Sequence, residues 1–289
     1  MSQPGDAPGP LAAVAMPRPR TVLVLGGGGM KGIAHIGVWR ALEEHGVWPD
    51  AIVGTSMGAV IGACLGGGMG WRELAELARR LRKDDIVSIN RRSIWLGGVR
   101  ESAVFDGDHF LRFLKRSLPV HDFSRLSLPL RVNAVSLVSG EEVWFGSGVG
   151  EEAKVPLAVY ASCALPIYFP PARVGDDVLV DGGILDVLPV PQALAWGAER
   201  VVAVDVGSDL LPPAEGYFEK GMIAIHDRVL GLSLQQQRRT CLEKWTGPNL
   251  LYIRPRIGHL GGWDFERTQF LLEEGYRAGR EALAQPAAA

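Results

Sequence analysis

The sequence predicts an α/β fold: a central, mostly parallel sheet with helices on both faces. Two short apolar runs, Thr21–Leu25 and 51–53, are each followed by glycine, as is typical of strands buried on both faces. Helix-compatible runs, 33–45 and 57–65, follow the first and the second strand. A parallel pair of strands needs a crossover between them, so this alternation favours a parallel sheet.

The remaining elements follow from the same two periodicities. The first helix, 33–45, has its apolar residues on one side and ends before Gly46, a residue type common just after helices. Residues 130–137 alternate between apolar and polar and continue through a Ser-Gly turn into 142–145, which predicts a hairpin. Further helices are predicted at 71–81, 108–117, 155–161 and 191–196, and further strands at 178–180, 201–204 and 250–253.

Composition predicts one domain over residues 20–285, with a helical C-terminal part from about residue 210. Residues 1–19 carry several prolines and only a short apolar run, so we expect a disordered leader and not a signal peptide. No apolar run approaches the roughly 20 residues that a bilayer crossing needs. The net charge of -2 gives no bulk attraction to nucleic acid. Three cysteines without a C-x-x-C pair indicate reduced thiols, no zinc site and a cytoplasmic location.

The second strand runs into a Gly-x-Ser-x-Gly motif, formed by Gly54, Ser56 and Gly58, and then into the helix 57–65. This is the pattern of a nucleophile elbow, a sharp turn that carries the serine between a strand and a helix. A Cβ at either glycine would collide with neighbouring backbone when the serine is strained. The helix begins beside Ser56, so its free N–H groups favour a negative charge there. We therefore predict that Ser56 attacks an acyl ester.

The glycine-rich loop after the first strand has two nucleotide-related interpretations, and the sequence disfavours both. Gly27, Gly29 and Gly32 satisfy the dinucleotide fingerprint G-x-G-x-x-G. That fingerprint also needs an acidic residue about 20 positions later, and the second strand ends without one. A phosphate loop needs Gly-Lys before Ser or Thr, whereas here Lys31 precedes Gly32 and no hydroxyl follows.

A third interpretation of this loop is an oxyanion hole. In a parallel sheet, the loops at the carboxyl ends of adjacent strands lie side by side, so Gly27, Gly28 and Gly29 are expected near Ser56. Their unshielded amides would then face an oxygen on the carbon that the serine attacks. A tight turn without a ligand is the alternative, and a run of four glycines favours the functional interpretation.

A serine hydroxyl is a weak nucleophile and needs a base. Of the six histidines, His226 and His259 follow the chain order of α/β-hydrolases, but neither lies in a loop after a strand. Asp181 ends an apolar strand, so we expect it at the same sheet edge as Ser56, where burial would raise its pKa. Asp205 also ends a strand and is the second choice. The alternative for Asp181 is that it only caps its own turn.

Four motifs follow one another along the chain. They are G-G-G-x-K-G at 27–32, G-T-S-M-G at 54–58, an apolar loop at 161–171 and D-G-G at 181–183. Together they resemble the patatin-like phospholipase family in its bacterial branch, over roughly residues 20–205. The resemblance implies a patatin-like α/β fold and a Ser–Asp dyad that uses no histidine.

The resemblance also implies a role for each motif. Ser56 would be the nucleophile and Asp181 the base, with no cofactor and no metal. The amides of the glycine loop, helped by that of Met57, would stabilise the oxyanion, and Lys31 would order this loop or face solvent. The loop 161–171 would form part of the site wall. The motif residues are Gly27, Gly28, Gly29, Lys31, Gly32, Gly54, Gly58, Gly182 and Gly183.

These interpretations predict a serine acyl hydrolase of the lipase or phospholipase type that cleaves acyl esters of lipids in lipid breakdown. An amphipathic stripe from Phe218 to Leu232 would allow peripheral contact with a membrane, or would pack inward or against a second copy. One rival is a histidine-dependent hydrolase that uses His226 or His259. The other is a non-catalytic lipid- or nucleotide-binding module on the same scaffold. The sequence leaves the oligomeric state open.

Overall fold

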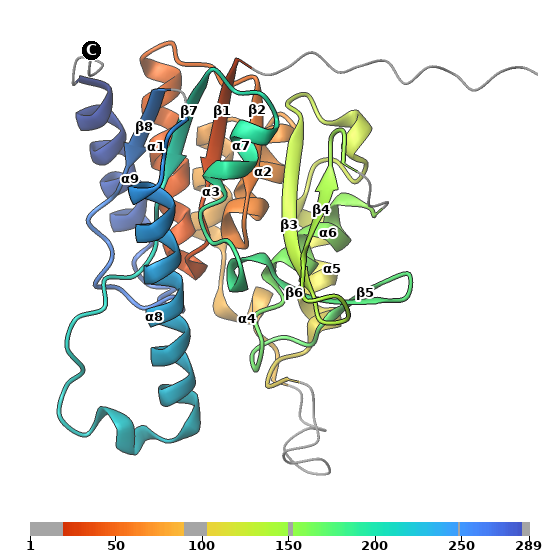
Figure 1. Ribbon diagram of the computed structural model, residues 1–289, viewed down its shortest axis with the longest axis vertical. Helices are drawn as coiled ribbons and strands as arrows, with labels where there is room; N and C mark the ends of the chain where they lie inside the picture. The colour runs from red at the N-terminus through yellow and green to blue at the C-terminus, as the bar shows by residue number, and fades with distance from the viewer. Residues whose placement is uncertain (1–19, 90–102, 150–152, 248, 285–289) are drawn as a thin grey trace, which may run out of the picture.

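The computed structural model describes residues 20–89, 103–149, 153–247 and 249–284, so the predicted leader lies outside the described residues. Within them, one eight-stranded sheet has the strand order β5-β6-β3-β2-β1-β7-β8, with β4 also paired to β3 (Figure 1). The strands are Thr21–Leu25 (β1), Ala51–Gly54 (β2), Leu130–Ser136 (β3), Glu142–Gly146 (β4), Ala172–Val174 (β5), Asp177–Asp181 (β6), Arg200–Val204 (β7) and Asn249–Ile253 (β8).

The sheet is mostly parallel, as predicted. The neighbouring strands β3, β2, β1, β7 and β8 pair in parallel. At one edge the β3–β4, β3–β6 and β6–β5 pairs are antiparallel, and β3–β4 is the predicted hairpin. The sequence did not predict β5, because this three-residue strand is too short to show a period.

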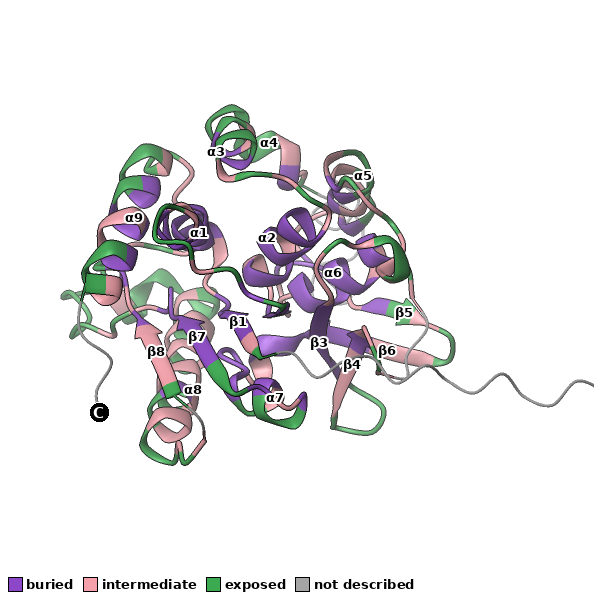
Figure 2. Ribbon diagram, turned by 90° about the horizontal axis from the view of Figure 1, so that it is seen from above, coloured by how far each residue is buried: buried purple, intermediate pink, exposed green. Residues whose placement is uncertain are grey.

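Helices cover both faces of the sheet (Figure 2), which confirms the predicted fold class. On one face lie α1, α2 and α6 with α3, α5 and α9 outside them, and on the other lie α7 and α8. The α-helices are Ala34–Glu44 (α1), Met57–Gly66 (α2), Trp71–Arg80 (α3), Lys83–Ile86 (α4), Gly107–Ser117 (α5), Val155–Cys163 (α6), Val190–Ala195 (α7), Met222–Glu243 (α8) and Thr268–Ala284 (α9). The 3-10 helices are Gly29–Ile33 (η1), Phe123–Arg125 (η4), Gly182–Ile184 (η5) and Tyr217–Lys220 (η6), and η1 shortens the predicted glycine loop.

The central strand β1 is buried because its side chains alternate between two apolar clusters. Leu23 and Leu25 belong to the cluster that includes α1 and α2. Val22 and Val24 belong to the cluster that includes α7. A continuous apolar run is therefore what this position requires, since neither face of the strand meets water.

The chain after residue 210 adds to the same sheet and its layers. β8 pairs in parallel with β7, and α9 packs closely on α1. A Cβ at Gly37 would lie 2.1 Å from Leu272 O, and a Cβ at Gly275 would lie 2.0 Å from Ala34 O, so glycine permits this approach. The N-terminal half of α8 extends below the sheet in Figure 1. None of the described helices combines the length and the apolar character that a bilayer crossing requires.

Candidate active site

Ser56 lies on a sharp turn between β2 and α2. Its φ of 54° and ψ of -123° are rare for a residue with a side chain. The flanking glycines make room for this turn: a Cβ at Gly54 would lie 2.7 Å from Gly58 O, and one at Gly58 would lie 2.0 Å from Leu25 O. The Ser56 N–H donates to Ser162 Oγ at 2.9 Å, which fixes the turn against α6.

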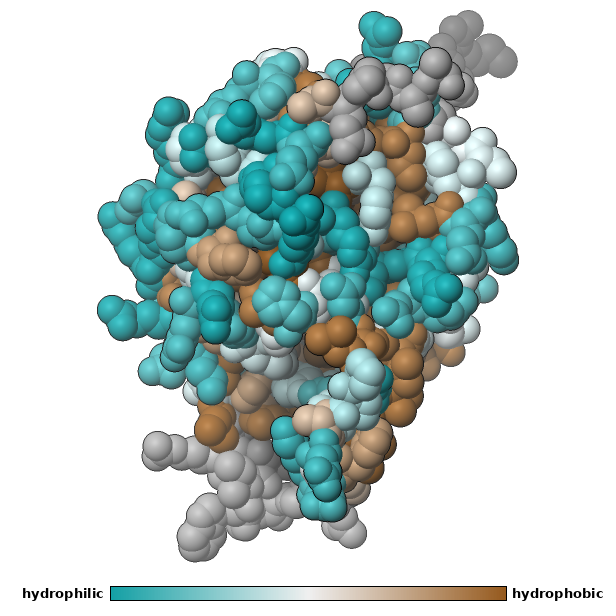
Figure 3. Space-filling model, turned by 90° about the vertical axis from the view of Figure 1, so that its left-hand side faces the viewer, coloured by the Kyte–Doolittle hydropathy of each residue, from teal (hydrophilic) through white to brown (hydrophobic). Residues whose placement is uncertain are grey.

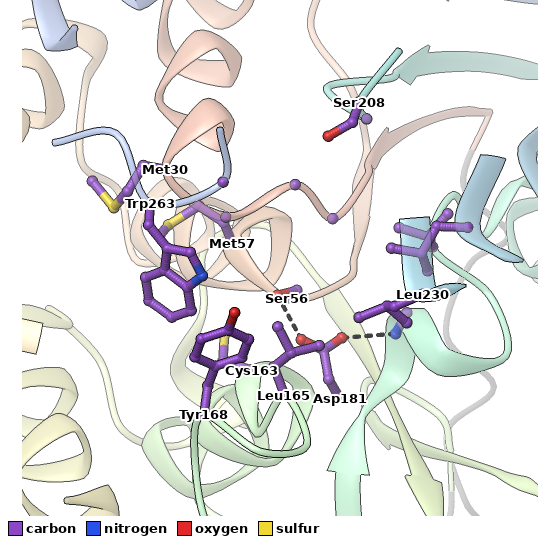
Figure 4. A pocket seen from close by; sticks show the side chains of 18 of the residues that line it. Met30, Ser56, Met57, Cys163, Leu165, Tyr168, Asp181, Ser208, Leu230 and Trp263 are labelled. Carbon is purple, nitrogen blue, oxygen red and sulfur yellow. Dashed lines mark hydrogen bonds between the residues drawn. The ribbon is translucent and has the colours of Figure 1, made fainter. Parts of the chain in front are cut away.

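The carboxyl group of Asp181 lies beside this serine (Figure 4). Ser56 Oγ donates to Asp181 Oδ2 at 2.8 Å, and the Gly183 N–H donates to Asp181 Oδ1 at 2.8 Å. Asp181 is only 4% exposed. Burial raises the pKa of Asp181 to about 7, against the opposing effect of the two hydrogen bonds. The serine hydroxyl therefore contacts a carboxyl group that gains or loses its proton near neutral pH.

Asp181 reaches this position for a different reason from the expected one. β6 runs antiparallel to β3, so its carboxyl end is not at the edge where the parallel strands end. β3 instead continues beyond the end of β2: Gly54 pairs with Val132, whereas Asp181 pairs with Ala134, further along β3. Asp181 thus ends β6 at the level of the turn that carries Ser56. Asp181 therefore lies beside Ser56 as expected, but not because the two strands end at the same edge of a parallel sheet.

The glycine loop lies beside the serine, but only part of its amides are free. The Gly27 N–H donates to Val187 O at 2.9 Å, so it is not available to an oxyanion, and the expectation for this amide is corrected. The N–H groups of Gly28, Gly29 and Met57 have no hydrogen-bond acceptor in the described part of the chain. The donors that remain therefore come from two elements, the loop after β1 and the start of α2.

Lys31 does not face solvent, which corrects one of the two expectations for this residue. Its side chain is 2% exposed, and Nζ donates to Ser208 Oγ at 2.5 Å. Burial and the nearby Arg238 cation lower the pKa of Lys31 to about 8. Lys31 thus ties the glycine loop to the segment after β7. Gly32 lets α2 approach this loop, because a Cβ there would lie 2.3 Å from Met57 Cγ.

The other candidate bases have partners elsewhere. Asp205 is buried and forms ion pairs with Arg238 and Arg254. His226 pairs with a neighbouring aspartate, and His259 is exposed. Among the described residues that line the pocket around the serine, none is a histidine. The structure therefore brings one acid, and no imidazole, to the serine hydroxyl.

A mainly apolar pocket of about 250 Å³ opens over Ser56 and Asp181. The loop predicted to form part of its wall does so through Cys163, Leu165, Tyr168 and Phe169. In Figure 4 the rings of Tyr168 and Trp263 stand side by side at the pocket, with centroids 4.9 Å apart. Other apolar residues of the lining are Met30, Met57, Ile86, Phe110, Ile184, Val187, Leu230 and Leu234. Such a lining suits an aliphatic chain.

Sequence reasoning missed the contribution of α8 and of a buried polar network. Leu230, Leu234 and Arg238 of α8 line the pocket, and no local pattern indicated which face of this helix would do so. Asn133 Oδ1 on β3 accepts a hydrogen bond from the Thr55 hydroxyl at 2.9 Å. This bond supports the turn before the serine. An asparagine inside a buried strand was the one available signal of this support.

The fold and the site define an α/β protein with a nucleophile elbow, a serine on a strained strand-to-helix turn at the end of a parallel strand. The family model described as "Patatin-like phospholipase" matches residues 23–194, more than half of the chain. This chain therefore belongs to the patatin-like phospholipase family, as the four motifs indicated.

Relatives and solved structures agree with this assignment. The chain is 34% identical over 209 residues to an uncharacterized NTE family protein of Mycobacterium tuberculosis, covering 72% of this chain and 55% of that protein. It is 30% identical over 283 residues to Lysophospholipase NTE1 of Coccidioides immitis, covering 90% of this chain but only 17% of that protein. The chain thus spans about half, or much less, of the length of these relatives. VipD from Legionella pneumophila shares the fold, with a TM-score of 0.53 at 16% identity, covering 92% of this chain and 67% of that chain.

The raised pKa of Asp181 predicts how the substitution Asp181→Asn changes the pH dependence of stability. Between about pH 4 and pH 7 the native state keeps a proton that the unfolded state has lost. The contribution of Asp181 to the free energy of unfolding therefore falls as pH rises through that window. The slope reaches at most about 1.4 kcal/mol per pH unit. Urea unfolding at pH 5, 6 and 7 should show a smaller loss of stability with rising pH in the variant.

The comparison isolates Asp181 because other groups titrate in both proteins. His35, whose pKa burial lowers to about 4, acts in the opposite sense in each of them. Asp176→Asn, on the exposed turn between β5 and β6, is the control and should keep the wild-type dependence. Identical pH dependence in wild type and Asp181→Asn would contradict the raised pKa.

Proposed function

We propose that this chain is a serine acyl hydrolase that cleaves acyl esters of lipids, with Ser56 as the nucleophile and Asp181 as the base. The observation that carries the proposal is the 2.8 Å hydrogen bond from Ser56 Oγ to Asp181 Oδ2 at an apolar pocket. Family membership supports the reaction class, and one relative bears the name lysophospholipase. A histidine-dependent mechanism is disfavoured, since the pocket lining described above includes no histidine.

In the first half of the reaction, Asp181 takes the proton of Ser56 Oγ while this oxygen attacks the ester carbonyl carbon. A base with a pKa near the working pH is well matched to this task, and Asp181 has a pKa of about 7. The ester C–O bond then breaks, and the leaving alkoxide takes the proton from Asp181. The acyl group remains on the serine as an ester.

In the second half, Asp181 accepts a proton from water while the water oxygen attacks the acyl-serine carbonyl. The C–O bond to Ser56 breaks, the serine oxygen regains its proton from Asp181, and the fatty acid leaves. The Gly183 N–H holds the second carboxylate oxygen, so Oδ2 stays directed at the serine. The dyad returns to its starting state without any further group.

The negative charge on the carbonyl oxygen is stabilised by the free amides of Gly28, Gly29 and Met57. Met57 begins α2, so the positive end of this helix adds to the same effect. A donor that meets the oxyanion only in the transition state contributes about 3 kcal/mol in comparable sites. The apolar lining, including Leu165 and Phe169, holds the acyl chain.

Replacement of Ser56 by alanine tests the nucleophile. A fluorophosphonate probe should label the wild-type protein covalently and should not label Ser56→Ala, because the attacking oxygen is absent. Hydrolysis of p-nitrophenyl esters and of phospholipids should fall by at least about 10³-fold. Ser139→Ala, on the exposed turn after β3, is the matched control and should label like wild type.

The labelling result also separates the proposal from its rivals. Equal labelling of wild type and Ser56→Ala would exclude this serine as the nucleophile. A wild-type protein that binds lipid or nucleotide, but neither labels nor turns over any ester, would support the non-catalytic module instead.

The proposal extends to a peripheral membrane contact through α8 and η6. The expectation that the amphipathic stripe packs inward is wrong for much of it, since Met222 is 84% exposed. Figure 3 looks at the left-hand side of Figure 1 and shows hydrophobic side chains at the surface in the lower part of the molecule. The exposed apolar residues of this docking face are Phe218, Met222, Ile223, Ile225, Val229 and Leu232. Leu230 and Leu234 of the same helix line the pocket, so a bilayer on this face would lie next to the helix that forms part of the pocket wall.

Two acidic substitutions on α8 test this contact. Met222→Asp with Val229→Asp should reduce flotation with phosphatidylcholine–phosphatidylglycerol liposomes by at least about tenfold, because two exposed apolar side chains no longer enter the lipid. Hydrolysis of a water-soluble ester should stay near the wild-type rate. Val138→Asp, on the β3–β4 turn, is the control, since Val138 is 71% exposed on another element. Unchanged flotation of the double variant would count against the membrane contact. So would a wild-type dimer that the two substitutions dissociate.

A further inference from the structure

The two strands that carry the serine and the acid share one edge of β3. β2 runs parallel to β3, and its last residue, Gly54, pairs with Val132. β6 runs antiparallel to β3, and its last residue, Asp181, pairs with Ala134. A strand has two edges, and β4 pairs with the same stretch of β3 along the other one. The carboxyl ends of β2 and β6 therefore face each other along β3, and Asn133 is the residue between them.

The side chain of Asn133 is buried behind these two strand ends. Val132 and Ala134 belong to the apolar cluster that includes α2, and successive side chains of a strand point to opposite faces of the sheet. Asn133 is 0% exposed. A buried amide costs free energy unless its polar atoms are hydrogen-bonded, so the partners of this amide explain its place in the sheet.

Both ends of the Asn133 amide are hydrogen-bonded, and they bond to different halves of the site. Oδ1 accepts from the hydroxyl of Thr55, the residue before the nucleophile, at 2.9 Å. Nδ2 donates to Asp186 O at 3.0 Å and to Gly182 O at 3.4 Å, in the turn that follows Asp181. One side chain thus links the turn before the serine to the turn after the acid.

The turn after Asp181 passes this restraint on to the carboxyl group. Gly182 O accepts the N–H groups of Leu185 and Asp186 at 3.2 and 3.0 Å, so the turn is compact. The N–H of Gly183, inside this turn, donates to Asp181 Oδ1 at 2.8 Å (Figure 4). A movement of the turn would therefore move the carboxyl group relative to the serine.

Glu142 fixes which way round the amide lies. Asn133 Nδ2 donates to Glu142 Oε1 at 3.1 Å, across the β3–β4 pair. A carboxylate oxygen and a main-chain carbonyl oxygen are acceptors only, so exchange of the amide N and O would bring Oδ1 against acceptors. An amide also offers an acceptor to one side and donors to the other, whereas a carboxylate offers acceptors alone. These contacts therefore select asparagine, in one orientation.

We propose that Asn133 is a positioning residue, which holds the turns of Ser56 and Asp181 at the separation where the hydroxyl donates to the carboxylate. The inference rests on the proposed function, because that function gives Ser56 and Asp181 their roles. Asn133 is not among the described residues that line the pocket, so it acts on the reaction only through the two turns. A misplacement of about 1 Å between reacting groups can cost about 100-fold in rate, and it leaves the apolar wall that binds substrate unchanged.

Two substitutions break this link at different points. Thr55→Val removes the hydroxyl and keeps the shape of the side chain, whereas Asn133→Asp keeps the acceptor for Thr55 and removes the donors to the turn after the acid. Each should lower kcat for a water-soluble p-nitrophenyl ester, and the rate of fluorophosphonate labelling, by about 10- to 100-fold and leave KM within about twofold. Because both changes break one link, the double variant should lose no more than about the larger single effect.

Ser136→Ala is the matched control on the same strand. Ser136 is 1% exposed, its hydroxyl donates to Asp177 Oδ1 at 2.7 Å, and its Oγ accepts two N–H groups of the turn after β3. Its loss should lower Tm but leave kcat and the labelling rate at the wild-type values. Wild-type kcat in Thr55→Val, additive losses in the double variant, or an equal loss of kcat in Ser136→Ala would overturn the positioning role. If Asn133→Asp fails to fold, Thr55→Val decides alone.

A titration of the Asp181 carboxyl group tests the link without turnover. Burial raises the pKa of Asp181, and the hydrogen bond from Ser56 opposes this effect. Loss of that bond in Thr55→Val should therefore raise the pKa further, by at least about half a pH unit. Carboxyl ¹³C NMR measures this, with the Asp181 signal assigned through Asp181→Asn. Thr55→Val leaves the nearby carboxyl groups of Glu142 and Asp186 in place.

This titration also separates the positioning role from the proposed function. A wild type that neither labels nor hydrolyses any ester, but whose Asp181 pKa rises in Thr55→Val, would refute the proposed function and leave the positioning role in place. An Asp181 pKa that stays the same in Thr55→Val would overturn the positioning role, and a wild type that labels at Ser56 would then keep the proposed function.

Discussion

The hydrogen bond between Ser56 and Asp181 is the contact on which the rest of the site depends. It joins a strained turn after a parallel strand to the end of an antiparallel one, so both strands must end at the same level. Gly58 allows the turn, and Gly182 allows the chain to leave β6, because a Cβ at Gly182 would lie 2.3 Å from Asn133 Oδ1. A side chain at either glycine would move one partner away from the other.

Burial raises the pKa of Asp181, and α8 contributes to the pocket wall and to the loop behind this acid. Gln237 holds the loop that follows Asp181, since its Nε2 donates to Ile184 O at 2.8 Å and its Oε1 accepts the Val187 N–H at 3.3 Å. Nearer the start of the helix, Asp227 Oδ2 accepts a hydrogen bond from the Tyr168 hydroxyl at 2.6 Å, at the pocket wall. One helix therefore connects the loop behind the acid, the wall of the pocket and an exposed apolar face.

The sequence predicted the features that depend on local patterns. The strands around Ser56 and the need for glycine beside it follow from residue spacing alone, and the family follows from four motifs in order. The parts that failed depend on contacts between distant segments. Lys31 is buried because Ser208, far along the chain, accepts its hydrogen bond, and the Gly27 amide is occupied by Val187 O. No local pattern reports such partners, and the direction of β6 likewise depended on its pairing with β3.

In the proposed mechanism, the ionisation of Asp181 controls nucleophilic attack, so the pH dependence of kcat/KM is the most direct test of its role. For a water-soluble p-nitrophenyl ester, kcat/KM of the wild type should rise with pH through one ionisation near pH 7 and then level off. In Asp181→Asn this ionisation should disappear together with most of the activity. The same ionisation at the same pH in the variant would show that another group is the base, and the Ser–Asp assignment would then be wrong.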